Sequence, residues 1–135
     1  MALNEKELQQ KYMEFQVIQQ QIEQLQQQLH TLNQQLQQLE LTKNNLNELT
    51  SVKSGTDSFS QIAPGIFVES TIKNTEKLLV NVGANTAVEK SVPQAIALVE
   101  EQEKLATQNI NETDKVLQQL STDAMKLYEQ LQNVQ

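Results

Sequence analysis

The sequence predicts an α+β fold: a long antiparallel two-helix coiled coil with two β-hairpins at its closed end. Apolar residues recur every seven positions in the first and the last third of the chain, and every two positions in the middle. Turn residues stand where the period changes. We therefore divide the chain into an N-terminal coiled-coil helix (1–54), a β-hairpin assembly region (55–91) and a C-terminal coiled-coil helix (92–135).

The first helix carries an apolar seam over residues 8–46, where ten of the twelve a and d positions are apolar. Asn4 followed by Glu7 resembles a capping box, which predicts a helix start at this point. The helix should stop before Gly55, because the heptad register ends there and Ser54-Gly55 offers a C-terminal cap. The a and d positions are Leu8, Lys11, Phe15, Ile18, Ile22, Leu25, Leu29, Leu32, Leu36, Leu39, Lys43 and Leu46.

The middle of the chain contains four expected strands. Residues 66–72 and 78–82 have the alternation of half-buried strands, and the polar stretch 73–76 joins them. Turn residues at 64–65 and 83–85 predict two hairpins, each completed by a shorter strand. The shorter strands are expected at Ser58–Ile62 and Thr86–Glu89.

Two hairpins alone are marginal in water and leave unpaired edges, so strands of other subunits are expected to complete the sheet. The apolar residues of the strands are then the assembly surface. They are Phe59, Ile62, Ile66, Val68, Ile72, Leu78, Val80, Val82 and Val88.

The second helix should begin near Val92, because Ser91 and Gln94 form another capping box and Pro93 lies in the first turn. Its seam over residues 96–134 again has ten apolar residues at twelve a and d positions. Two seams of about equal length joined by roughly 40 residues predict a chain that folds back on itself.

Four polar residues interrupt the two seams: Lys11, Lys43, Glu103 and Thr113. At a and d positions such residues most often specify register or extend their polar ends to solvent. Antiparallel pairing brings Lys43 and Glu103 within about one helical turn of each other, ~5 to 6 Å. We expect this pair to align the helices.

The composition excludes several classes of function. The formal net charge is −7 and all ten basic residues are Lys, so the arginine contacts that read guanine are absent and nucleic acid is not an expected partner. No cysteine is present, no apolar run is long enough to span a bilayer, and the first residues lack a signal-peptide core. We expect a cytoplasmic protein that does not associate with membranes.

Candidates for catalysis or for a cofactor are few. His30 is the only histidine, at a b position without a second metal ligand at helical spacing, which favours a solvated surface residue. The three glycines form no phosphate-binding loop, and each has a turn to explain it. We predict a non-enzyme without metal or cofactor.

The turn sequence Val80–Ala84, followed by Val88–Lys90 and by Ala95 inside the second helix, resembles the prefoldin α subunit when it lies between two helices of this length. The resemblance covers the whole chain, and two hairpins rather than one are similar to the α class. It implies an ATP-independent chaperone that holds unfolded protein and delivers it to a group II chaperonin. It also implies a hexamer of two α and four prefoldin β subunits, with six coiled-coil arms on a β-barrel base.

The family carries client contacts at the outer ends of its arms, and three of the five aromatic residues here lie near the expected open end. Tyr12 and Tyr128 occupy e positions beside the seam, and Met13 at f points away from it. Flexible Met and amphipathic Tyr suit promiscuous binding. The predicted client-binding residues are Leu3, Leu8, Tyr12, Met13, Phe15, Tyr128, Leu131 and Val134.

Two alternatives stay open. Four of these residues are also ordinary seam positions: Leu8, Phe15, Leu131 and Val134. A tyrosine ring also tolerates exposure at a surface, because its hydroxyl forms hydrogen bonds with water. The runner-up interpretation of the whole chain is a structural spacer that tethers partners and has no client-binding surface.

Overall fold

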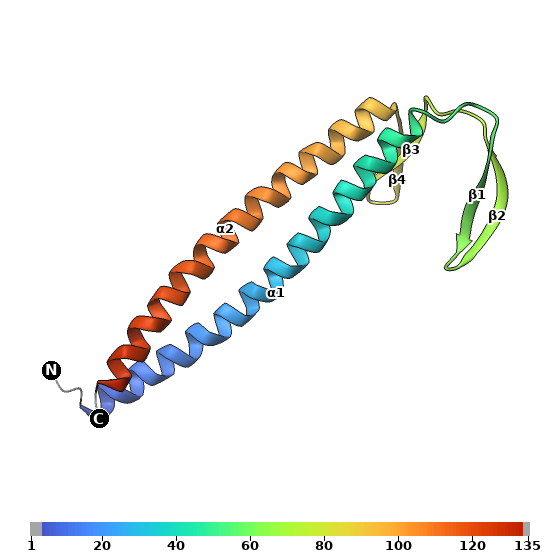
Figure 1. Cartoon of the computed structure of the whole chain (residues 1–135). Helices are drawn as coiled ribbons and strands as arrows, with labels where there is room; N and C mark the ends of the chain where they lie inside the picture. Colours follow the sequence, from blue (N-terminus) through green and yellow to red (C-terminus); the bar gives the residue numbers. More distant parts are fainter. Residues whose placement is uncertain (1–3, 134–135) are drawn as a thin grey trace. The chain divides into compact units, whose positions relative to one another are not determined.

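The computed structural model describes residues 4–133. Two long helices, α1 (Glu5–Leu49) and α2 (Val92–Gln132), enclose four strands in the sequence: β1 (Thr56–Ala63), β2 (Ile66–Ile72), β3 (Leu78–Gly83) and β4 (Thr86–Lys90) (Figure 1). The predicted combination of long helices and two hairpins is confirmed. The barrel is a property of several chains and stays a prediction, as does the division at 54/55 and 91/92.

Two compact units make up the chain. The helical unit contains α1 up to Leu36 and α2 from Leu105 on, and the hairpin unit runs from Gln37 to Lys104. Each unit therefore contains a stretch of both helices, and the hairpin unit also contains all four strands.

Helix α1 begins as predicted and ends earlier than predicted. The side-chain oxygen of Asn4 accepts a hydrogen bond from the Glu7 amide at 2.8 Å, and Glu5 and Glu7 complement the helix dipole in the first turn. The helix stops at Leu49 rather than next to Gly55. Amides 50, 51 and 52 donate instead to the carbonyls three residues before them, at 3.2, 3.0 and 3.1 Å, so the last turn tightens and the α-helix ends.

Helix α2 begins at Val92, as its capping box predicts. The Gln94 amide donates to Ser91 Oγ at 3.2 Å, and the Ser91 amide donates to Gln94 Oε1 at 3.0 Å. Both halves of the reciprocal cap are thus formed. The Ala95 amide then donates to the Ser91 carbonyl at 2.9 Å, which starts the helical ladder.

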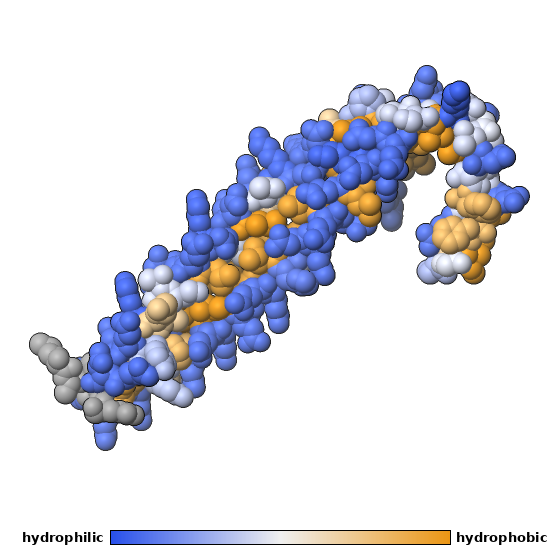
Figure 2. Space-filling model, viewed as in Figure 1, coloured by the Kyte–Doolittle hydropathy of each residue, from blue (hydrophilic) through white to orange (hydrophobic). Residues whose placement is uncertain are grey.

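The apolar core is a narrow seam. Only α2 has side chains exposed by less than a tenth, and α1 has none among its described residues. Figure 2 shows apolar side chains in a line between the helices, with hydrophilic side chains on both sides of that line. Two helices cannot enclose a larger core, because each has only one neighbour. The buried residues are Val92, Ala95, Val99, Ala106 and Thr113.

Each hairpin is a separate two-stranded antiparallel sheet. In the first, Thr56 pairs with Ile72 and Ala63 with Ile66, and the register shifts between Gln61 and Ala63. Strand β1 is therefore longer than the predicted Ser58–Ile62, because pairing with β2 continues to both ends of the hairpin. The Pro64-Gly65 turn connects the strands, with Gly65 at φ 78°.

The second hairpin turns through Ala84 and Asn85, which both have positive φ, 51° and 59°. Two such residues define a type I′ turn, whose twist matches that of antiparallel strands. Its pairing runs from Leu78–Lys90 to Gly83–Thr86, so β4 is one residue longer than predicted. Among the described residues neither hairpin has a third strand, and both therefore keep free edges.

In the part of the chain that the structure describes, no helix has an apolar stretch that would let it cross a membrane.

Candidate functional site

A broad apolar hollow of about 950 Å³ lies at the end of the helical unit where α1 begins and α2 ends. Aliphatic, aromatic and Met side chains line most of it, and amide side chains line the rest. We call it the tip hollow. It is lined by Leu8, Gln9, Tyr12, Met13, Phe15, Tyr128, Leu131, Gln132 and Asn133.

Six of the eight residues predicted for client binding line the tip hollow. Tyr12, Met13 and Tyr128 are 54%, 65% and 51% exposed, so about half or more of each side chain stays uncovered. The other two residues predicted for this surface, Leu3 and Val134, lie outside the described residues.

The remaining three residues belong both to the seam and to the hollow. Leu8, Phe15 and Leu131 are half-buried, as seam residues are. Each of them nevertheless lines the hollow as well. The floor of the hollow is thus the exposed side of the seam, which two helices alone do not cover.

Aromatic and polar contacts hold the two helices together beside the hollow. The rings of Phe15 on α1 and Tyr128 on α2 have centroids 6.2 Å apart and are tilted by 33°, an arrangement typical of stabilising aromatic pairs. Lys11 Nζ donates to Gln130 Oε1 at 2.7 Å, so this polar seam residue joins the helices. The Tyr128 hydroxyl accepts from Gln132 Nε2, also at 2.7 Å.

A second hollow of about 770 Å³ continues from the first. Phe15 and Tyr128 line both, so the aromatic pair lies between the two hollows. Its other lining residues include Ile22, Ala124 and Met125. Met125 is 66% exposed and was missed by the sequence reasoning. Its b position lies outside the a and d seam, so the heptad spacing gave no signal for it.

The hairpins expose a second set of apolar side chains. Of the nine predicted assembly residues, six are at least 40% exposed and three are half-buried: Ile72, Leu78 and Val80. Figure 2 shows apolar side chains on the first hairpin among hydrophilic ones. The six exposed residues are Phe59 (66%), Ile62 (68%), Ile66 (55%), Val68 (47%), Val82 (49%) and Val88 (40%).

Sequence reasoning missed two exposed apolar residues of the hairpins, Phe67 at 59% and Leu79 at 74%. In the alternation of the strands, Phe67 falls in the opposite phase from the predicted assembly residues Ile66 and Val68, and Leu79 was not assigned to either face. The pairing of Gln61 with Phe67 and of Phe59 with Glu69 puts the two Phe side chains on one face as diagonal neighbours. Ile66 and Val68 lie on the opposite face, so the first hairpin is apolar on both faces.

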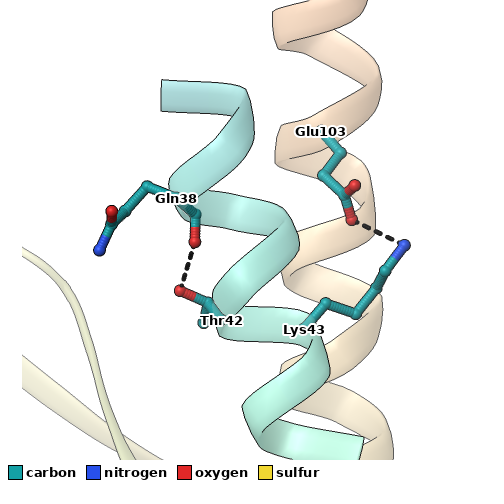
Figure 3. Close-up of polar contacts among 4 residues, drawn as sticks. All are labelled: Gln38, Thr42, Lys43 and Glu103. Atoms are coloured by element: carbon teal, nitrogen blue, oxygen red, sulfur yellow. Dashed lines mark hydrogen bonds and ion pairs between the residues drawn. The ribbon is translucent and has the colours of Figure 1, made fainter. Parts of the chain in front are cut away.

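The predicted register of the helix pair is confirmed in the hairpin unit. Lys43 Nζ on α1 lies 3.0 Å from Glu103 Oε1 on α2, and the side chains are 32% and 14% exposed (Figure 3). Glu103 Oε1 is buried, and its contact with the Lys43 ammonium is an ion pair. The close polar contact with Glu103, helped by its charge and opposed by desolvation, raises the pKa of Lys43 above its ordinary value.

The histidine and the acidic side chains are spread along the described residues 4–133. His30 is exposed and its Nε2 lies 3.2 Å from Gln34 Nε2 on the next turn. Within the same residues no three His, Asp or Glu side chains are grouped as metal ligands.

Two long helices that share a narrow seam and are joined through two exposed hairpins define a coiled-coil protein with uncovered apolar surface. The chain belongs to the prefoldin family, whose model, described as prefoldin subunit, matches residues 18–135. Prefoldins are chaperone subunits, and theirs is not an enzyme family.

Similar proteins include curated archaeal prefoldin α subunits. The one from Archaeoglobus fulgidus is 28% identical over 128 residues, 95% of this chain and 93% of that protein. The one from Pyrococcus horikoshii is 29% identical over 136 residues, 100% of this chain and 92% of the relative. The resemblance to the α subunit noted in the sequence is thus confirmed.

Among solved structures, a filamentous PFD from Methanocaldococcus jannaschii matches with a TM-score of 0.76, over 85% of this chain and 95% of that one. The sequence identity is 19%, so this likeness concerns the fold.

Proposed function

We propose that this chain holds unfolded polypeptides at the tip hollow, without ATP, and delivers them to a group II chaperonin. The observation that carries the proposal is the hollow itself. Three side chains, Tyr12, Met13 and Tyr128, are more than half exposed around its half-buried floor. Soluble proteins rarely leave a contiguous apolar area of this kind uncovered unless it serves binding.

The chemistry of the hollow suits a partner without a fixed structure. Met is flexible and polarisable, so its contacts tolerate different side chains, and Tyr combines an apolar ring with a polar hydroxyl. Burial contributes about 25 cal/mol per Å² of apolar surface, so a single tip hollow binds a client with low affinity. Several hollows in one assembly would raise affinity, because the first contact increases the effective concentration of the second.

The assembly that we propose contains two copies of this chain and four prefoldin β subunits around a β-barrel base. It is supported by the free strand edges of both hairpins and by their exposed apolar side chains. The family resemblance alone suggests the stoichiometry, the chaperonin as recipient and the cytoplasm as location.

The test is a triple variant, Tyr12→Ser, Met13→Ser and Tyr128→Ser, co-expressed with a candidate β subunit. We expect the complex to form normally and to lose most of its suppression of aggregation of a chemically unfolded client, measured by light scattering. These side chains are more than half exposed, so we expect the helices to stay folded, and the helical circular dichroism checks that loss of the Phe15–Tyr128 contact has not unfolded them.

The matched control replaces three exposed apolar residues elsewhere on the helices, Val17, Leu105 and Val116, which are 51%, 55% and 50% exposed. Their replacement by Ser should leave suppression intact. If the tip variant protects the client as well as the control does, the tip hollow is not the binding site and the structural spacer is the better description.

A further inference from the structure

The two hollows of the helical unit form one groove along one side of the helix pair. On α1 their lining extends from Leu8 to Gln26, about 27 Å at 1.5 Å per residue. The Phe15–Tyr128 pair lines both hollows and makes the groove continuous. A helix of about 18 residues or an extended segment of about eight would span this length.

The walls of the groove are helices, and this restricts what can bind in it. The backbone donors and acceptors in the interior of α1 and α2 are satisfied within each helix, so the groove offers side chains and no strand edge. An extended peptide on the half-buried apolar floor would leave many of its own backbone groups without partners, at a cost for each. A helical segment satisfies its backbone internally and needs only an apolar stripe.

The charges around the groove favour a basic ligand. Glu23 is the only charged residue that lines either hollow. At the other end, the last turn of α2 contains no basic residue of its own, and Lys11 of α1 donates to Gln130 in that turn. The described residues of the helical unit include eight Asp and Glu against four Lys.

We propose that the groove selects client segments that form a basic amphipathic helix of about 18 residues and binds them as a third helix, with Lys or Arg on the side that faces Glu23. This inference rests on the proposed function and specifies its substrate class. Apolar side chains of the client cover the seam between α1 and α2, and a basic side chain lies near Glu23.

The test uses fluorescein-labelled 18-residue peptides and fluorescence anisotropy on the complex of the full chain with its co-expressed β subunit. The first peptide has Leu at helical spacing with Lys on the other face, and the second has the same composition with Leu and Lys alternating. The third replaces Lys by Glu, and the fourth has a central Pro in the first peptide. We expect the first to bind about tenfold more tightly than each of the others and to gain helical circular dichroism on binding.

Variants of the chain locate the binding. Met125→Ser should weaken the first peptide, whereas Val116→Ser, outside both hollows, should not. Glu23→Gln should weaken it about two- to fivefold, as an exposed charge pair does, and Glu14→Gln, which lines neither hollow, should have no such effect.

Equal or tighter binding of the alternating, acidic or Pro-containing peptide would overturn the inference, as would binding indifferent to Met125→Ser. So would occupation of the groove by a second copy of the chain, seen as crosslinking between copies through residue 125. Any of these can occur while client protection still depends on Tyr12, Met13 and Tyr128, so failure of the helix inference is distinguishable from failure of the proposed function.

Discussion

Replacement of both Phe59 and Phe67 by Ser should weaken assembly of this chain with its partner subunits and leave its helices intact. The two side chains are diagonal neighbours on one face of the β1–β2 hairpin and are 66% and 59% exposed. No described residue covers them to the extent that a core would, so their loss costs the isolated chain little. The loss of the two side chains makes the free energy of association less favourable, because a partner that covers this face no longer buries them.

The magnitude follows from the exposed area. An enclosed aromatic side chain buries about 200 Å², so these two leave roughly 250 Å² for a partner to cover. At about 25 cal/mol per Å² that area is worth up to about 6 kcal/mol of association free energy. If the partner covers only half of it, the loss is about 3 kcal/mol, or about a hundredfold in the dissociation constant.

Mass photometry of the complex with a co-expressed candidate β subunit, over a dilution series, measures this effect. The double variant Phe59→Leu and Phe67→Leu should retain assembly because it keeps apolar surface. Leu41→Ser, which removes a 53% exposed side chain from α1, should assemble like the unmodified chain. An unchanged dissociation midpoint for the double Ser variant would refute the assignment of this face to assembly.

Two further predictions concern the stability of the helices. Ser91→Ala removes the hydroxyl that caps α2 and should destabilise the chain by about 1 kcal/mol in thermal or urea unfolding. Ser121→Ala, inside α2, is the control and should not destabilise the chain. Equal effects of the two substitutions would contradict the role of the cap. Because the pKa of Lys43 is raised, its ion pair with Glu103 stabilises the fold fully below pH 10.5 and loses this effect as the pH rises through the raised value. The melting temperature should therefore fall more steeply above about pH 10.5 in the unmodified chain than in Lys43→Met, and Lys115→Met is the matched control. If the melting temperatures of the unmodified chain and of Lys43→Met change in parallel with pH, the ion pair contributes nothing.

Heptad spacing and capping residues determined most of the helical part of the fold. The Lys43–Glu103 pair follows from spacing alone, because two interrupted seams of equal length have one register that brings the polar interruptions together. The start of α2 at Val92 also follows from local chemistry, since Ser91 and Gln94 satisfy each other's amides. The end of α1 does not, because i−3 hydrogen bonds after Leu49 compete with continuation of the helix.

The candidate site was predicted in part. Periodicity placed Tyr12 and Tyr128 beside the seam and Met13 pointing away from it, all near one end, and all three line the tip hollow. It did not select Met125, because a b position lies outside the a and d seam. Only the folded helix pair shows that Met125 lines the second hollow.

In the hairpins, too, the sequence determined some features and the folded chain decided others. Turn residues and alternation fixed two hairpins and their order, since Gly65 and the Ala84-Asn85 turn determine where the chain reverses. Exposure of Phe67 and Leu79 was decided by the tertiary structure, because a two-stranded sheet without a covering layer leaves both faces open to solvent. The sequence by itself thus determined the elements and the helix register through local periodicity. Only the folded chain decided which apolar surface stays uncovered, because that depends on what packs against each face.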